Sequence, residues 1–264
     1  MIVAAMDAPD VTKATPPSRP ELSVVMPVYN EAEAVEPVVR AWADELDRLN
    51  ICYEFLVYDD GSRDRTADVL RHIAIEKPQI VVRSHANMGH GPTIWRGYRE
   101  ATGDWVFQVD SDDEMSPPAF EQLWTRRADH DLLLGCRKDR HATVARRIIS
   151  VGSRAVVRLL FGSGLWDVNT PYRIIRRSAL AAMLPRIPAR AFAPNVIMAG
   201  LAVRDRLRVH QVWVPHQPRR VGTASIAGWK QWRTAFRCAV ETASVALGAR
   251  ASAHRAAPVR HGDD

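Results

Sequence analysis

The sequence predicts an α/β fold in which a mostly parallel sheet is flanked by helices. Through the first 115 residues, short apolar runs typical of strands alternate with amphipathic helical stretches. The turns between them are short, as expected where helices connect parallel strands. Acidic residues also follow three of the predicted strands, and parallel strands place such ends along one edge of a sheet.

Four strands are predicted in the first half of the chain, at residues 22–28, 53–58, 80–84 and 105–109. The helix predicted over residues 34–49 places five apolar side chains on one face: Val35, Val38, Val39, Trp42 and Leu46. Thr66 is expected to cap the second helix. Pro92 fits the first turn of a third helix that ends at Ala101.

After Pro118 the alternation of strands and helices loosens. The elements are then predicted as helix 120–127, strand 131–135, a basic helix within 137–158, strand 172–175, a helix from a Ser178 cap to Leu184, strand 208–214 and helix 228–247. One face of the last helix carries Trp229, Trp232, Phe236, Val240 and Leu247. This stripe is consistent either with contact with a membrane surface or with packing on its own domain.

One globular domain with extensions at both ends is the predicted organisation. Residues 1–20 contain four prolines and predict a disordered leader. Residues 21–226 are expected to form the domain, 227–248 an amphipathic helix and 249–264 a flexible tail. No stretch reaches the ~18 consecutive apolar residues of a membrane-spanning helix.

The composition, 47% hydrophobic and 25% charged, is that of an ordinary globular protein with a sizeable core. The net charge of +6 favours an anionic partner, such as a nucleotide, a phospholipid surface or a nucleic acid. Three scattered cysteines form no paired motif and suggest a reducing compartment.

Four carboxylates follow the predicted strand 105–109 within five residues: Asp110, Asp112, Asp113 and Glu114. Crowded carboxylates repel each other unless a cation joins them, and such hard oxygen ligands suit Mg²⁺ or Mn²⁺. Acids also follow two other strands, at Glu31 and at Asp59 and Asp60. Each group alone is also consistent with a solvated turn, but their convergence at one edge indicates a binding site.

Five motifs in this order and spacing resemble an inverting family 2 glycosyltransferase with the Rossmann-like GT-A fold. They lie at residues 25–31, 59–66, 87–91, 103–104 and 110–112. Looser motifs resemble dolichol-phosphate mannose synthases and bacterial polyprenyl-phosphate sugar transferases. Those motifs lie at residues 135–137, 146–152, 167–173 and 219–222. The resemblance implies metal-dependent transfer of a hexose from GDP-mannose or a UDP-sugar to a polyprenyl or dolichyl phosphate.

The resemblance also assigns roles to single residues. Nucleotide-sugar contacts are expected from Pro27, Tyr29, Glu31, Tyr58, Asp60, Asp110, Ser111 and Asp112. Mg²⁺ or Mn²⁺ is expected on Asp110, Asp112 and Glu114. Acceptor phosphate is expected on Arg137, Arg146, Ser150 and Arg219. The catalytic set is Asp110, Asp112, Arg137 and Asp167, where Asp167 serves as a base only if the acceptor is a neutral hydroxyl.

Three departures from the family pattern concern the acceptor more than the donor. Asn195 stands where the family usually has an acidic residue, and Asn169 begins a variant of the usual Ser-Gly pair. The closing motif that begins at Arg219 lacks its lysine. The segment from Asp167 to Arg173 is expected to act either in the active site or as a structural ion pair.

Three other functions are weighed against transfer to a lipid phosphate. They are the same donor chemistry with a soluble acceptor, a non-catalytic basic module that binds RNA or anionic lipid, and a nucleotidyltransferase. The leading prediction is a cytoplasmic enzyme at the inner face of the membrane, with peripheral membrane contact and no nucleic acid partner. His85, His90 and His216 are considered as a base or ligand but set aside, because nothing nearby repeats a ligand spacing.

Overall fold

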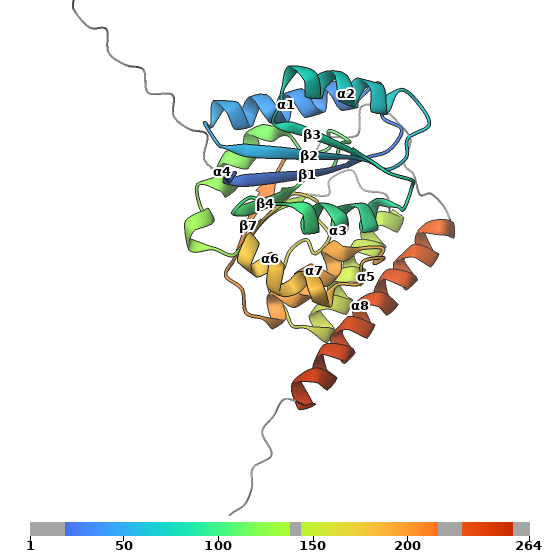
Figure 1. The fold of residues 1–264 in the computed structure, drawn as a ribbon. Helices are drawn as coiled ribbons and strands as arrows, with labels where there is room; N and C mark the ends of the chain where they lie inside the picture. Colours follow the sequence, from blue (N-terminus) through green and yellow to red (C-terminus); the bar gives the residue numbers. More distant parts are fainter. Residues whose placement is uncertain (1–18, 138–143, 216–228, 256–264) are drawn as a thin grey trace, which may run out of the picture.

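The computed structural model describes residues 19–137, 144–215 and 229–255 (Figure 1). Within these residues, a seven-stranded sheet has the order β3-β2-β1-β4-β6-β5-β7. The strands are β1 Leu22–Val28, β2 Tyr53–Asp59, β3 Ile80–Ser84, β4 Trp105–Gln108, β5 Leu132–Arg137, β6 Arg173–Arg176 and β7 Val209–Val214. Only β6 runs antiparallel to its neighbours among these strands. The predicted α/β fold with a mostly parallel sheet is therefore confirmed.

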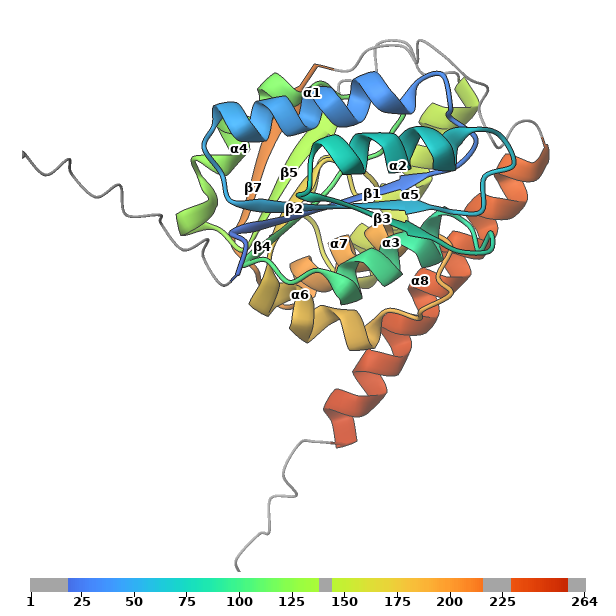
Figure 2. The same ribbon diagram turned by 45° about the horizontal axis from the view of Figure 1, so that its top comes forward.

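Helices cover both faces of the sheet (Figures 1 and 2). One face carries α1 Val35–Arg48, α2 Thr66–Glu76 and α4 Phe120–Trp124. The other carries α3 His90–Glu100, α6 Arg177–Met183 and α7 Pro194–Arg204. Short 3₁₀ turns occupy Pro117–Ala119, Arg127–Asp129 and Leu184–Arg186. Helices α5 Val144–Leu160 and α8 Trp229–Arg255 pack against each other and against α7.

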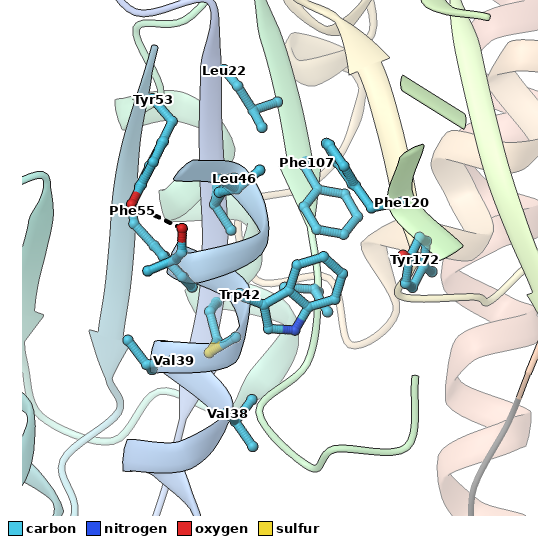
Figure 3. Packing of buried hydrophobic residues seen from close by; sticks show 14 of the residues in the cluster. Leu22, Val38, Val39, Trp42, Leu46, Tyr53, Phe55, Phe107, Phe120 and Tyr172 are labelled. Atoms are coloured by element: carbon cyan, nitrogen blue, oxygen red, sulfur yellow. Dashed lines mark hydrogen bonds between the residues drawn. The ribbon is translucent and has the colours of Figure 1, made fainter. Parts of the chain in front are cut away.

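The aromatic side chain of Trp42 joins α1 to the middle of the sheet (Figure 3). Its ring centroid lies 5.0 Å from that of Phe107 on β4, 6.1 Å from Phe120 on α4 and 5.6 Å from Tyr172. All four rings are buried. This contact fixes α1 over β4, the strand that leads into the acidic loop, because buried aromatic residues contribute several kcal/mol each.

Two predicted helix starts are wrong. Thr66 is the first residue of α2 rather than its cap, and Asp64 accepts a hydrogen bond from the Thr66 backbone N–H at 3.0 Å. Ser178 lies inside α6, which begins one residue earlier, at Arg177. In both places a hydroxyl side chain suggested an N-cap, but the backbone is already helical at that residue.

Arg137 is the last residue of β5 and does not belong to the basic helix predicted within 137–158. It pairs with Val214 in the register of β5 and β7, and the helix α5 begins only at Val144. Helix α7 was not predicted. Its first nine residues are all buried, so its sequence carries no polar face from which a helical period could be recognised.

Parts of the predicted extensions lie outside the described residues, namely 1–18, 227–228 and 256–264, as do residues 138–143 and 216–226 of the predicted domain. The last two residues of the expected leader are placed against the start of β4: Arg19 Nε donates a hydrogen bond to the carbonyl of Thr102 at 2.8 Å. Helix α8 continues to Arg255, beyond the expected end at Leu247. Arg219 and His216 lie outside the described residues, as does the side chain of Arg146.

Candidate active site

The carboxyl ends of β1, β2 and β4 lie next to one another at one edge of the sheet (Figure 2). Hydrogen bonds tie the three following loops together at this edge. The Ser111 hydroxyl, after β4, donates to the carbonyl of Pro27 on β1 at 3.0 Å. The backbone N–H of Asp60, after β2, donates to the carbonyl of Val28 at 2.9 Å. The sheet edge therefore gathers the acids that follow three separate strands, as the sequence predicted.

Asp60 holds the loop that leads into α3. Its carboxylate is buried and accepts hydrogen bonds from the backbone N–H groups of Met88 at 2.7 Å and Gly89 at 2.9 Å. The turn itself is stabilised by Asp59 instead, which accepts a hydrogen bond from the Ser62 N–H at 2.9 Å. Asp60 thus has a structural role at this edge, and its contact with a nucleoside stays a prediction.

His90, the first residue of α3, contacts the acidic loop after β4. Its Nε2 lies 3.0 Å from Asp110 Oδ1, which also accepts a hydrogen bond from Gln108 Nε2 at 3.2 Å. Dense surroundings lower the pKa of His90, but the charge and hydrogen bond of Asp110, followed by the charges of Asp112 and Asp60, outweigh them and raise it above its ordinary value. The sequence analysis set His90 aside because nothing nearby repeats a ligand spacing, and its partner Asp110 lies 20 residues further along the chain.

Asp110 is held as an anion at this edge. Burial raises its pKa, but the charge and hydrogen bond of His90 and the charge of Arg137 lower it below its ordinary value. Asp112 is half-buried, and its Oδ1 accepts a hydrogen bond from the backbone N–H of Glu114 at 3.2 Å. Asp110 and Asp112 thus lie together at the sheet edge. The positive charges of His90 and Arg137 act on Asp110, and the charge of Asp112 acts on His90.

This donor set fits a hard divalent cation. Mg²⁺ and Mn²⁺ accept carboxylate oxygens, and Mg²⁺ is usually held by one or two carboxylates together with substrate phosphates and water. Asp110 and Asp112 supply such a pair, and Glu114 adds a third, buried carboxylate to the same loop. Among the described residues no three acidic, histidine or cysteine side chains already converge on one point.

Arg137 and Asp167 form a two-point ion pair next to this edge. Arg137 Nε donates to Asp167 Oδ2 at 2.9 Å and Nη2 donates to Oδ1 at 3.3 Å. Burial raises the pKa of Asp167, but the charge and hydrogen bond of Arg137 lower it below the ordinary value. This pairing holds the Arg137 guanidinium in one orientation. It also makes the Asp167 carboxylate a poorer proton acceptor.

Arg173 does not pair directly with Asp167, although one interpretation of the sequence expected a structural ion pair in this segment. Its side chain is fully buried and donates to backbone carbonyls, among them Thr170 at 2.6 Å and Asn195 at 3.1 Å. Burial lowers the pKa of Arg173, whereas the charge of Asp167 is among the contributions that raise it. Arg173 thus lies in the interior of the fold, where it ties together the backbone at Thr170 and Asn195.

Asn195 belongs to the same buried layer. Its Oδ1 lies 3.2 Å from the oxygen of the Tyr98 hydroxyl, which donates its hydrogen to Gln108 Oε1 at 2.8 Å. Gln108 in turn contacts Asp110. The residue that departs from the family pattern therefore lies in a polar network that reaches the acidic loop from below.

Other predicted contacts are less direct. Tyr58 is fully buried and donates its hydroxyl hydrogen to Glu100 at 2.9 Å, so its hydroxyl is engaged inside the fold and its contact with a nucleotide stays a prediction. Tyr29 is exposed, and Ser150 on α5 is half-buried. A hollow of about 630 Å³ opens beside Glu31, between the starts of α1 and α2. Its described lining comes from residues 30–34 and from Asp64, Arg65 and Val69.

Comparison with known proteins decides the family. The model described as Glycosyl transferase family 2 matches residues 23–183, which is more than half of the chain. The chain belongs to glycosyltransferase family 2. This confirms the resemblance of this glycosyltransferase to the family that its sequence motifs indicated.

Two relatives carry the same name. The undecaprenyl-phosphate 4-deoxy-4-formamido-L-arabinose transferase of Sodalis glossinidius is 30% identical over 212 residues, which cover 79% of this chain and 63% of that protein. The corresponding transferase of Pectobacterium carotovorum is 29% identical over 206 residues, which cover 77% of this chain and 62% of that protein. The glycosyltransferase thus spans a little under two thirds of the length of these relatives.

Solved structures share the fold. Glucosyl-3-phosphoglycerate synthase from Mycobacterium tuberculosis, in complex with Mn²⁺, UDP-glucose and phosphoglyceric acid, has a TM-score of 0.61 and 19% identity, covering 84% of this chain and 80% of that chain. A mannosyltransferase from Pyrobaculum calidifontis, in complex with GDP-Man and Mn²⁺, has a TM-score of 0.58 and 18% identity, covering 92% of this chain and 78% of that chain. These similarities establish the GT-A-like α/β fold.

Proposed function

We propose that this glycosyltransferase moves a sugar from GDP-mannose or a UDP-sugar to a polyprenyl phosphate, with inversion at the anomeric carbon. The observation that carries the proposal is the acidic loop after β4, with Asp110 tied to His90 and lying in the field of Arg137 at the carboxyl edge of the sheet. Negative charge leaves with the nucleoside diphosphate, and this edge combines cation-binding carboxylates with cationic side chains.

Asp110, Asp112 and Glu114 are proposed to hold Mg²⁺ or Mn²⁺. When bound, such an ion neutralises the charge that develops on the leaving diphosphate. The two solved relatives that carry Mn²⁺ with a nucleotide-sugar support this choice of cation. His90 and Gln108 keep Asp110 in place, because both contact the same carboxylate oxygen.

The nucleotide is proposed to lie along the ends of β1 and β2. Glu31 and Asp60 follow these strands, and the carbonyl of Pro27 is joined to Ser111 of the acidic loop. Tyr29 is exposed at the same end of β1 and is available to cover a base or ribose. The buried Tyr58 is not needed for this arrangement.

A lipid phosphate is the acceptor that fits the cationic side of the site. It is already anionic near neutral pH, so it needs cations to place it beside the donor and needs no general base. Arg137 is fixed by Asp167. Arg146 and Ser150, the next proposed phosphate ligands along the sequence, belong to α5. Arg219 completes the proposed set from outside the described residues. The names of the relatives, which are undecaprenyl-phosphate transferases, support this acceptor.

A soluble hydroxyl acceptor is the second candidate. In that case Asp167 is the proposed base, but its pairing with Arg137 and its lowered pKa disfavour proton uptake. We propose a hexose as the transferred sugar, although the relatives are named for an arabinose derivative. We also place the enzyme on the cytoplasmic side of a membrane, where a lipid phosphate and a nucleotide-sugar can meet.

The test is a turnover panel with purified enzyme. GDP-mannose, UDP-hexoses and a UDP-pentose are each incubated with Mg²⁺ or Mn²⁺, with and without a short-chain polyprenyl phosphate. We expect one donor to release its nucleoside diphosphate, with a sugar-bearing lipid as product and with loss of turnover in EDTA. Turnover of no donor under any of these conditions, or a pyrophosphate product, would contradict the proposal.

A further inference from the structure

The outer surfaces of α5 and α8 carry apolar side chains where a helix of a globular protein normally carries polar ones. On α5 the exposed apolar residues are Ile148, Val151, Ala155 and Leu159. On α8 they are Trp232, Phe236, Val240 and Leu247. Their spacing of three, four or seven residues places each set along one side of its helix. Leu159 is 82% exposed and Phe236 is 73% exposed, so neither contributes to the core.

The two stripes meet along one seam. A groove of about 200 Å³ between α5 and α8 is lined by Ile148 and Gly152 from one helix and by Trp232 from the other. Ile148 and Trp232 are also members of the exposed stripes, so the stripes border the same groove from opposite sides. The inner sides of both helices are already packed, with Val157 and Cys238 buried in one cluster. The outward stripes therefore meet at this groove, through Ile148 and Trp232.

Arginines flank this surface on both helices. Arg154 and Arg158 lie on α5 and are exposed, and Arg233 is exposed on α8. The sequence of α5 contains no acidic residue, and that of α8 contains only Glu241, which pairs with Arg237 at 2.7 Å. An apolar strip bordered by arginines complements a lipid surface whose acyl region is apolar and whose headgroups are anionic.

We propose that the α5–α8 face lies on an anionic phospholipid surface, with the two stripes in the headgroup–acyl boundary and the arginines on headgroup phosphates. No helix in the described part of the chain is both long and apolar enough to cross a membrane. Amphipathic helices such as these make contact in the plane of the surface. Figures 1 and 2 show that α8 lies along the outside of the molecule, where a flat surface can reach it.

The same face adjoins the site. The segment after α5 leads to Asp167, and Arg154 Nη1 donates a hydrogen bond to the carbonyl of Trp166, the residue before it, at 3.2 Å. Val168, the residue after Asp167, is buried in the cluster that joins α5 and α8. If the proposed lipid acceptor is correct, which this step assumes, the docked face brings the acceptor phosphate close to Arg137.

The test is flotation of the full chain with vesicles, in the absence of donor and acceptor. One vesicle type is pure phosphatidylcholine, and the other is an equal mixture of phosphatidylcholine and phosphatidylglycerol. We expect stronger flotation with the anionic vesicles. Leu159→Glu and Phe236→Glu should each weaken binding at least about tenfold, because each places a charge in the apolar boundary. Ile75→Glu is the matched control, since Ile75 is 80% exposed on α2, and it should bind like the wild type.

A second pair of variants tests the charges. Arg158→Glu and Arg233→Glu should each weaken binding to the anionic vesicles by at least about fivefold and have little effect with phosphatidylcholine alone. Wild-type protein that does not float with anionic vesicles, or stripe variants that float as well as the wild type, would overturn the proposal. A wild-type dimer that Phe236→Glu converts to a monomer, without flotation, would assign the face to a second copy and also overturn it.

These outcomes are separate from the proposed reaction. Vesicle binding needs neither metal nor nucleotide-sugar, so its failure leaves the donor chemistry standing. Conversely, a protein that floats but turns over no donor would retain the docking surface and lose the proposed function.

Discussion

At the scale of single residues, His90 joins the start of α3 to the acidic loop after β4. It contacts Asp110 at 3.0 Å, so a ring nitrogen and a carboxylate from separate elements hold each other in place. We expect His90→Gln to lower turnover about tenfold, because groups that orient a metal ligand typically contribute 10- to 100-fold. The measurement is steady-state turnover at several Mn²⁺ concentrations. His72→Gln, an exposed histidine on α2, is the control and should behave like the wild type.

Asp167 distinguishes the two acceptor classes. If the acceptor is a lipid phosphate, Asp167 only orients Arg137, so Asp167→Asn should raise the KM for the acceptor more than it lowers kcat. If the acceptor is a hydroxyl, the same change removes the base and lowers kcat about 100-fold or more. Measuring both constants with a short polyprenyl phosphate checks this. A kcat loss of that size with KM unchanged would contradict the lipid-phosphate acceptor.

Asp131, far from the acidic loop in sequence, links the start of β5 to the residue before β7. It accepts hydrogen bonds from Arg208 Nη2 at 2.8 Å and Nε at 3.1 Å. The Arg208 side chain lowers the pKa of Asp131 to about 2. Because the pKa in the folded state lies below its unfolded value, the stabilisation is present above about pH 4 and is lost as the pH falls towards 2.

We therefore expect Asp131→Asn to lower the free energy of unfolding by about 1 kcal/mol at neutral pH, allowing for the solvent exposure of Arg208. The difference from the wild type should shrink as the pH is lowered through this window. Urea denaturation at neutral pH and at about pH 3 measures it. The exposed neighbour Asp129→Asn is the control, and an undiminished difference in acid would show that the ion pair is not the cause.

At the scale of elements, Gly91 lets the start of α3 approach the segment before α7. A Cβ atom at Gly91 would lie closer than 3.0 Å to the backbone carbonyl oxygens of both Ala191 and Phe192. We expect Gly91→Ala to destabilise the fold by about 3 kcal/mol, because backbone atoms cannot yield as a flexible side chain can. Turnover should also fall, since His90 is the adjacent residue.

Thermal unfolding monitored by circular dichroism tests this effect. Gly248→Ala on α8 is the matched control: apart from its chain neighbours and the backbone of its own helix, no heavy atom lies within 4 Å of the added Cβ. That change should leave stability equal or raise it by up to about 1 kcal/mol, because alanine is the better helix former. Equal unfolding temperatures for Gly91→Ala and the wild type would show that the close approach is not tight.

Elements with a regular apolar pattern could be predicted from the sequence. Helix α1 and the strands β1, β2 and β3 lie where hydrophobic spacing put them, because each buries one face or a short continuous run. Helix α7 was missed because almost every side chain in it is buried, which removes the period. The strand end at Arg137 was hidden by the basic residues that follow it.

The site was predictable only in part. Acids at strand ends indicated the edge of the sheet, since a parallel topology brings such ends together. The pairings of His90 with Asp110 and of Arg137 with Asp167 were not predictable, because each joins elements that the sequence alone does not place side by side. The burial of Tyr58 follows from the alternation of side chains along β2, which sends it towards α3.

At the scale of the whole molecule, the sheet edge and the α5–α8 face supply different parts of one proposed function. The edge gathers carboxylates and a histidine for a nucleotide-sugar, while the two helices present apolar stripes with arginines for a lipid surface. The segment through Trp166 and Asp167 connects them. On the proposed function, a soluble donor and a membrane-bound acceptor would meet on this domain.

The most direct test of this account is calorimetric titration of GDP and of UDP into the protein with Mn²⁺. We predict that at least one nucleotide binds, and that EDTA or Asp112→Asn weakens its binding at least about tenfold. Asp68→Asn, an exposed aspartate on α2, should bind like the wild type. Equal affinity with Mn²⁺ and with EDTA, in the wild type and in Asp112→Asn alike, would contradict a metal-assisted nucleotide site at the sheet edge.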